Sequence, residues 1–167
     1  MTLFRSLAST MATNSGRARF VLRASFLAIA PSLLIFGVLV AMGIDTLRAP
    51  TGTLDPAFMV YSVLLAPVVE TGAMLALAAV LARLLPRHAA LQILLLAFVA
   101  ALARRIGGDW RQVVNTTWPI LVYATSLVLW LRRSASDAFI VTTIVHALYN
   151  MAFFAVGILG RLVFSET

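Results

Sequence analysis

Five long apolar blocks divide the chain, and they constrain its fold more than any other feature. They cover residues 24–44, 57–82, 89–106, 113–131 and 138–159. A helix needs about 20 predominantly apolar residues to cross the hydrocarbon core of a bilayer. Backbone polar groups in lipid must pair within their own segment, so blocks of this length are expected to be helical. We predict an all-α, polytopic transmembrane bundle of about five segments over residues 24–164, preceded by a polar, basic segment at 1–23.

The third block is the shortest of the five. Its apolar part ends at Ala103, and it continues into Arg104 and Arg105. Arginine side chains can reach the membrane interface from within a helix, and a segment can tilt to fit the bilayer. We therefore expect this segment either to cross with a tilt or to be partly re-entrant. In the re-entrant case the topology of everything downstream is inverted.

The composition excludes most other classes of protein. Hydrophobic residues make up 62% of the 167 residues and charged residues only 11%, whereas a soluble domain is about half apolar and a quarter charged. The formal net charge is +7, but the arginines fall between the apolar blocks and form no single stripe. We therefore expect a lipid bilayer, and no nucleic acid, as the partner. The absence of cysteine excludes disulfides and thiol nucleophiles.

Arginine placement predicts the orientation, because short cytoplasmic loops carry an excess of basic residues. With five spans and the N-terminus inside, eight arginines lie on the cytoplasmic side and five on the other side. The first group is Arg5, Arg17, Arg19, Arg23, Arg83, Arg87, Arg132 and Arg133, and the second is Arg48, Arg104, Arg105, Arg111 and Arg161. We expect an integral protein of a bacterial inner membrane with a cytoplasmic N-terminus.

Glu70 is the acidic residue that falls near the middle of an apolar block; the other five lie in loops or at the tail. A charged side chain at the centre of a bilayer costs roughly 2.5–3.5 kcal/mol even on the most lenient scale, and such residues usually serve a function. Pro67 precedes it and lacks an N–H, so the carbonyl of Val63 loses its helical partner and the helix can kink one turn before Glu70. A bent helix with a carboxylate just after the bend suits a polar cavity.

His146 and Asn150 are the second pair of rare polar groups in an apolar block. Their spacing of four residues places them on one helix face. Histidine exchanges protons near neutral pH, and an asparagine amide can donate to a developing oxyanion. The alternative is a polar contact of the kind that holds membrane helices together. With Glu70, the pair favours a functional site, and a catalytic interpretation requires that the three side chains converge.

The sequence predicts no metal and no cofactor. Catalytic zinc normally takes three protein ligands, and Glu70 with His146 supplies two. The chain contains no His-Glu-x-x-His helix, no Gly-x-Ser-x-Gly elbow and no phosphate-binding loop.

The segment from Ala66 to Glu70, followed by Ile144 to Asn150, resembles the CPBP family of membrane proteins. This family comprises CAAX prenyl proteases, bacteriocin-processing proteins and their relatives, which are glutamate-type intramembrane proteases. Its first motif is Glu-Glu-x-x-x-Arg, its second Phe-x-x-x-His and its last His-x-x-x-Asn or Asp. The last motif is matched by His146 and Asn150, and the first is matched at Glu70.

The other motif positions depart from the family pattern. Thr71 stands at the second glutamate and Leu75 at the arginine; if Phe98 begins the second motif, Leu102 stands at its histidine. The resemblance implies an endopeptidase acting on a membrane-anchored peptide or protein substrate. It implies that Glu70 activates water as the general base, and that His146 and Asn150 stabilise the tetrahedral oxyanion. Arg104 or Arg105 is a candidate to replace the missing histidine as an electrostatic donor.

Two alternatives remain open at this level. The losses at Thr71, Leu75 and Leu102 suit a catalytically degenerate relative that binds a membrane peptide, confers immunity or acts as a scaffold. A small proton-linked transporter subunit, in which Glu70 and His146 relay protons, is the other. The substrate and the oligomeric state are not encoded in any recognisable pattern.

Overall fold

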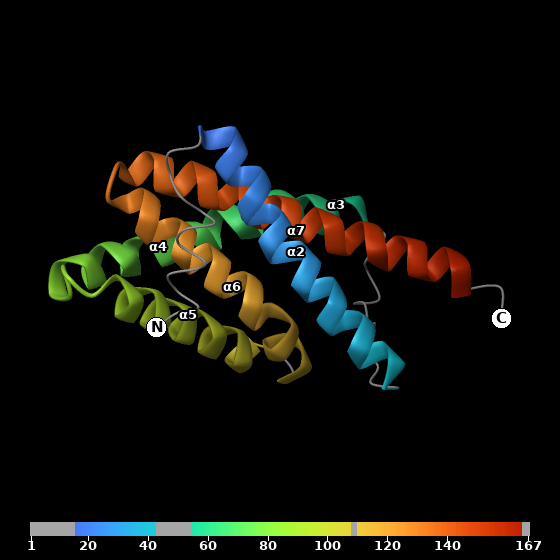
Figure 1. Ribbon diagram of the computed structural model, residues 1–167. Coiled ribbons are helices and arrows are strands. Elements are labelled where there is room, and N and C mark those ends of the chain that lie inside the picture. The colour runs from blue at the N-terminus through green and yellow to red at the C-terminus, as the bar shows by residue number, and fades with distance from the viewer. Residues whose placement is uncertain (1–15, 43–54, 108–109, 165–167) are drawn as a thin grey trace.

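The computed structural model describes residues 16–42, 55–107 and 110–164, without the side chains of 107, 110–112 and 160–164. The described chain is helical, and its helices are α2 (Arg17–Ala41), α3 (Pro56–Val60), a π-helical turn η1 (Tyr61–Leu65), α4 (Ala66–Leu84), α5 (Ala89–Gly107), α6 (Trp110–Leu131) and α7 (Ala135–Phe164). α3, η1 and α4 follow one another directly and make one long segment. The helices pack as a bundle with α6 near its centre (Figure 1). The all-α fold is thereby confirmed.

Five helical segments of the described chain are long and apolar enough to cross a membrane: Arg17–Ala41, Pro56–Leu84, Ala89–Ile106, Val113–Leu131 and Ala135–Leu159. The predicted number of spans is therefore confirmed. α5 is one unbroken helix of 19 residues, about 28 Å long at 1.5 Å per residue. The third block therefore does not turn back on itself, which removes the re-entrant alternative.

The helix ends differ from the edges of the apolar blocks. α2 begins at Arg17 and not at residue 24, since arginine and alanine are good helix formers whose long or small side chains tolerate the interface. It ends at Ala41, and the remainder of the predicted block, 43–44, lies outside the described residues, as do residues 1–15 of the predicted polar segment. Hydropathy therefore locates the membrane core, while the helix itself extends past it.

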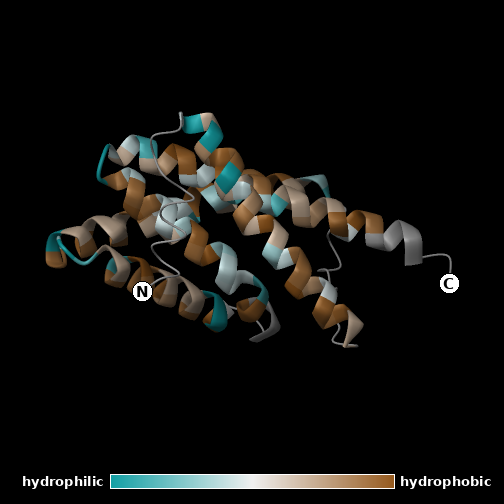
Figure 2. Cartoon of the chain, viewed as in Figure 1, coloured by the Kyte–Doolittle hydropathy of each residue, from teal (hydrophilic) through white to brown (hydrophobic). Residues whose placement is uncertain are grey.

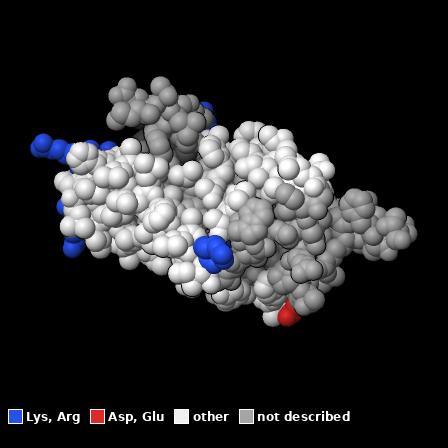
Figure 3. Space-filling view, turned by 90° about the horizontal axis from the view of Figure 1, so that it is seen from below, with Lys and Arg blue, Asp and Glu red and all other residues white. Residues whose placement is uncertain are grey.

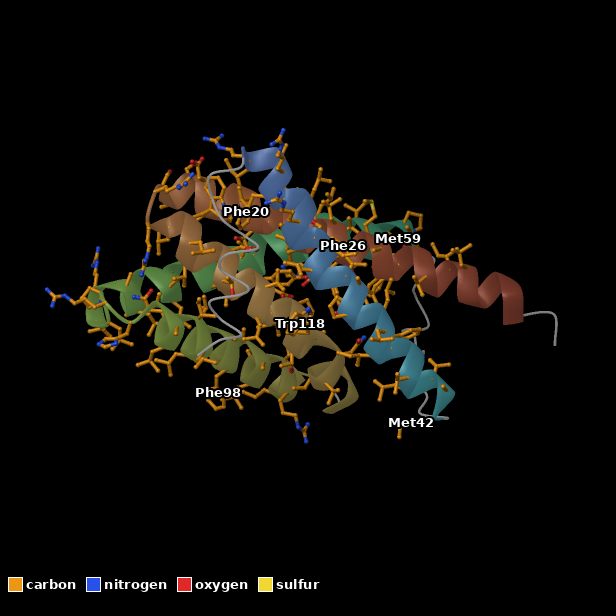
Figure 4. All side chains as sticks on the ribbon, viewed as in Figure 1. Phe20, Phe26, Met42, Met59, Phe98 and Trp118 are labelled. Atoms are coloured by element: carbon orange, nitrogen blue, oxygen red, sulfur yellow. The ribbon has the colours of Figure 1, made fainter. Side chains whose placement is uncertain are left out.

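Apolar side chains cover the outside of the bundle, as expected for a surface that faces lipid (Figure 2). Phe26 is 70% exposed and Phe98 64% exposed, and both lie on the outer surface of the bundle (Figure 4). α6 has 56% of its apolar window buried, twice the share of any other span. A helix that is apolar on all sides is stable in this arrangement because lipid replaces water around it.

α2 packs against α6 and α7 through small residues. Ala24, Ala28 and Ser32 recur every four residues and are fully buried, so the backbones can approach closely. At the start of this stripe the ring of Phe20 packs edge-on against Trp130, with centroids 5.3 Å apart.

Arginines gather at one end of the bundle, as the space-filling view of one face shows (Figure 3). This end holds the start of α2, the α4–α5 turn and the α6–α7 turn, and so Arg17, Arg19, Arg23, Arg83, Arg87, Arg132 and Arg133. A salt bridge of 2.8 Å joins Arg17 to Asp137 there and ties α2 to the start of α7. The predicted clustering of seven of the eight basic residues is present; Arg5 lies outside the described residues.

Candidate functional site

The segment that carries Glu70 begins with a well-defined cap and contains an irregular turn. The Asp55 side chain accepts a hydrogen bond of 3.0 Å from the N–H of Ala57, and Pro56 occupies the first helical position, both common at helix N-termini. At Tyr61–Leu65 the helix widens to a π turn, in which the N–H of Ala66 donates to the carbonyl of Tyr61. Single π turns inside α-helices are frequently found at functional sites.

Glu70 lies on α4, facing Arg104 on α5. Glu70 is 14 residues before the end of α4 at Leu84, and Arg104 is 15 residues after the start of α5 at Ala89. In an antiparallel hairpin these separations place both residues about 21–22 Å from the turn, at the same level. Arg104 Nη2 forms an ion pair with Glu70 Oε2. The two side chains are 35% and 43% exposed, so the pair sits at the edge of the bundle where a ligand can reach it.

His146 of α7 lies behind Glu70. Its Nε2 atom is 3.7 Å from Glu70 Oε2, and the side chain is only 2% exposed. This separation is slightly longer than a hydrogen bond and too short for an intervening water. A small rotation of either side chain brings the two into hydrogen-bond contact. The arrangement puts a buried imidazole and an accessible carboxylate side by side.

Tyr123 of α6 fixes the histidine ring from the other side. The two rings stack with centroids 4.5 Å apart and an angle of 26° between their planes. Tyr149, one residue before Asn150 on α7, meets Tyr123 edge-on at 6.2 Å. Stacked and edge-on pairs of this kind are worth about 0.5–1.5 kcal/mol beyond their buried area. The aromatic wall leaves the Nε2 side of His146 as the side that faces the carboxylate.

Asn150 lies one turn farther along α7 and contacts a different group. Its side-chain Nδ2 donates a hydrogen bond of 2.7 Å to the backbone carbonyl of Ser62, within the π turn. The structure therefore brings Glu70 and His146 together directly, while the amide of Asn150 is directed at the backbone one turn away. The sequence pattern predicts that all three residues lie on facing helices, but it does not predict the Ser62 contact.

Several polar atoms around the site are buried without a hydrogen-bond partner among the described residues. They include Thr71 Oγ1, beside Glu70, Thr142 Oγ1, one turn before His146, and His146 Nδ1 and Tyr123 Oη. Burying such groups unpaired costs about 1–3 kcal/mol each, which is characteristic of a site that holds water or a polar ligand. No cluster of three or more histidine, cysteine or acidic side chains is found in the described part of the chain.

Two residues of the site were missed or only partly foreseen. Arg104 was one of two arginines suggested as an electrostatic donor, and counting residues outward from the α4–α5 turn would have selected it. Tyr123 carried no signal in the sequence, because aromatic residues are frequent in membrane spans. Its position next to His146 follows from the packing of α6 against α7.

No protein-family model, no curated protein and no solved structure matches the chain. The function is therefore inferred from the geometry of the site and from the motif resemblance.

Proposed function

We propose that the protein is a CPBP-like intramembrane peptidase that uses Glu70 to activate water against a membrane-anchored peptide or protein substrate. The observation that carries this proposal is the contact between the accessible Glu70 carboxylate and the buried His146 imidazole, 3.7 Å apart and drawn from helices 76 residues apart in sequence. A carboxylate beside an imidazole supplies a proton acceptor and a proton donor at one point.

The reaction that fits this geometry is the hydrolysis of one peptide bond. The Glu70 carboxylate accepts a proton from water, and the resulting hydroxide adds to the substrate carbonyl carbon. The oxyanion that forms is stabilised by a hydrogen bond from His146 Nε2 and by the positive charge of Arg104. Collapse of the tetrahedral intermediate breaks the C–N bond, and Glu70 returns its proton to the departing amine. The peptide approaches from the exposed side of Glu70, because His146 is enclosed by Tyr123.

Arg104 accounts for one of the departures from the family pattern. The motif resemblance lacks a second histidine, for which Leu102 stands in this chain. Arg104, two residues later, brings a permanent cation to Glu70 Oε2. It is available to bind the oxyanion once the carboxylate has turned toward water. In this proposal Asn150 assists the transition state only through a second N–H, since the structure directs one to Ser62.

The test is the loss of cleavage in Glu70→Gln, which removes the proton acceptor and keeps the shape of the side chain. The protein is purified, reconstituted in liposomes and assayed against a panel of quenched fluorescent peptides that carry a lipid anchor. The expected result is a fall of at least 100-fold in rate. Asp137→Asn is the matched control: it also removes one negative charge, but at a salt bridge far along the bundle, and it should retain activity. Undiminished cleavage by Glu70→Gln would contradict the proposal.

A non-catalytic peptide-binding or immunity protein is the second candidate, and a specific observation favours it. Both the carboxylate of Glu70 and the amide of Asn150 already have partners within the chain, in Arg104 and Ser62. A protein of this kind would bind a lipid-anchored peptide without cleaving it. Under this alternative the wild-type protein leaves every peptide of the panel intact. Photocrosslinking at Val69, an exposed neighbour of Glu70, would then capture the uncleaved peptide.

A further inference from the structure

Two prolines in the spans leave a backbone carbonyl without its helical donor, and in both cases a side chain from another helix supplies one. Pro31 lacks the N–H that would pair with the carbonyl of Leu27. The indole Nε1 of Trp118 on α6 donates to that carbonyl at 2.6 Å. The second case is the contact between Asn150 and Ser62.

The π turn explains why Ser62 is the carbonyl that Asn150 reaches. In the regular α spacing, Pro67 would leave Val63 without a donor. The N–H of Ala66 instead donates to Tyr61, five residues back, and the same spacing assigns the missing N–H of Pro67 to the carbonyl of Ser62. Asn150 Nδ2 donates to this carbonyl at 2.7 Å. An amide N–H has thus been replaced by a side-chain amide from α7.

We propose that Asn150 is a positioning residue whose amide replaces the N–H absent from Pro67, holds the π turn open, and thereby sets the face of α4 on which Glu70 meets His146. The inserted residue of a π turn rotates the downstream part of the helix by about 100° relative to an uninterrupted α-helix. Without a donor for Ser62, the turn has an unsatisfied carbonyl in an apolar environment, which favours a change of helical register.

Asn150 and His146 act on this segment together. They lie four residues apart on α7 and contact Ser62 and Glu70, which lie eight residues apart on either side of Pro67. The segment is therefore tied to one face of α7 before and after its irregular turn. Loosening the first contact displaces the second. This role concerns the geometry of the resting protein and does not depend on the proposed peptidase activity.

The first experiment is a double-mutant cycle on thermal unfolding of the full chain in detergent. Asn150→Leu leaves Ser62 without a donor and should lower Tm by roughly 3–6 °C. In Pro67→Ala, the N–H of residue 67 can pair with Ser62, and the same Asn150→Leu change should lower Tm by less than half as much. Pro31→Ala is the control background, in which Asn150→Leu keeps its full effect. Trp118→Phe should show the reverse, coupling to Pro31→Ala and not to Pro67→Ala. An equal loss of Tm in all three backgrounds overturns the proposal.

The second experiment separates positioning from stability alone. The chain has two histidines, and His88→Gln in the exposed α4–α5 turn leaves His146 as the sole ¹⁵N-histidine signal. Asn150→Leu should shift the Nε2 resonance of His146, because Glu70 moves relative to it. A lower Tm with an unchanged Nε2 resonance overturns the positioning role. If Asn150→Leu gives no folded protein, Asn150→Ser, which is too short to reach Ser62, is taken through both measurements.

Discussion

Glu70 is a carboxylate within an apolar segment, and Arg104 is the residue that offsets its charge. Because both side chains are more than a third exposed, the pair resembles a partly solvated contact more than a buried one. Exposed ion pairs and polar contacts between membrane helices are each worth about 1 kcal/mol or less. The ion pair therefore makes insertion of Glu70 tolerable without dominating the stability of the bundle.

A double-mutant cycle measures this pair. Glu70→Gln and Arg104→Gln should each destabilise the protein, and their coupling in the double variant should be about 1 kcal/mol. The measurement is equilibrium unfolding in mixed micelles. The control cycle pairs Glu70→Gln with Arg83→Gln, which changes the same charges but places the arginine at the far end of α4. Coupling no larger than in the control would show that Arg104 does not compensate Glu70.

Tyr123 contributes its ring and not its hydroxyl. The ring stacks on His146 at 4.5 Å, whereas the hydroxyl is buried without a hydrogen-bond partner among the described residues. Tyr123→Phe keeps the stack and removes a desolvated polar group, so it should leave Tm unchanged or slightly higher. Tyr123→Leu removes the stack and should cost about 1–3 kcal/mol. Thermal unfolding of both variants checks this, and a larger loss in Tyr123→Phe would mean that the hydroxyl has a partner.

At the scale of helices, small residues decide how closely α2 approaches the rest of the bundle. Ala28 is fully buried in the Ala24–Ala28–Ser32 stripe. Ala28→Leu adds three carbons where the backbones meet and should destabilise the protein by about 1–3 kcal/mol. Leu34→Ala, on the lipid-facing side of the same helix and 71% exposed, should cost far less. Equal effects of the two changes, measured as Tm in detergent, would place the α2 contact elsewhere.

The same helices show which features the sequence could predict. Hydropathy located all five spans, because lipid demands about 20 apolar residues whatever the packing. It could not place the start of α2 at Arg17, since helical hydrogen bonding continues past the membrane core. Pro67 correctly indicated an irregularity before Glu70. The partner carbonyl is Ser62 and not Val63 because the π turn shifts the spacing by one residue, and no residue pattern encodes that shift.

The candidate site shows a similar division. Glu70 and His146 were recognisable individually, because ionisable groups are rare in apolar spans, and the structure places them in contact. Tyr123 and the Asn150–Ser62 hydrogen bond depend on how α6 and α7 cross the segment at 56–84. Such crossings arise from side-chain packing across the whole bundle, which a linear pattern of polar residues does not contain.

At the scale of the whole molecule, charge is distributed between the two ends of the bundle. Seven described arginines lie at the end that holds the α4–α5 and α6–α7 turns. Arg104 and Arg105 lie toward the end of α5, at the opposite side. Because basic loops are retained in the cytoplasm, the seven-arginine end should face it. Glu70, about 21 Å from that end, then lies in the outer half of the membrane, where its substrate bond should also lie.

The natural absence of cysteine makes this orientation directly testable. His88→Cys places a thiol in the exposed α4–α5 turn, and Ile106→Cys places one at the other end of α5, at a side chain that is 83% exposed. A membrane-impermeant maleimide applied to intact bacterial cells should label Ile106→Cys alone, and His88→Cys should react only after permeabilisation. The reverse pattern would invert the bundle and move Glu70 to the cytoplasmic half. Labelling of both thiols from the same side would mean that α5 does not cross the membrane, and the site would then have to be reached from that side.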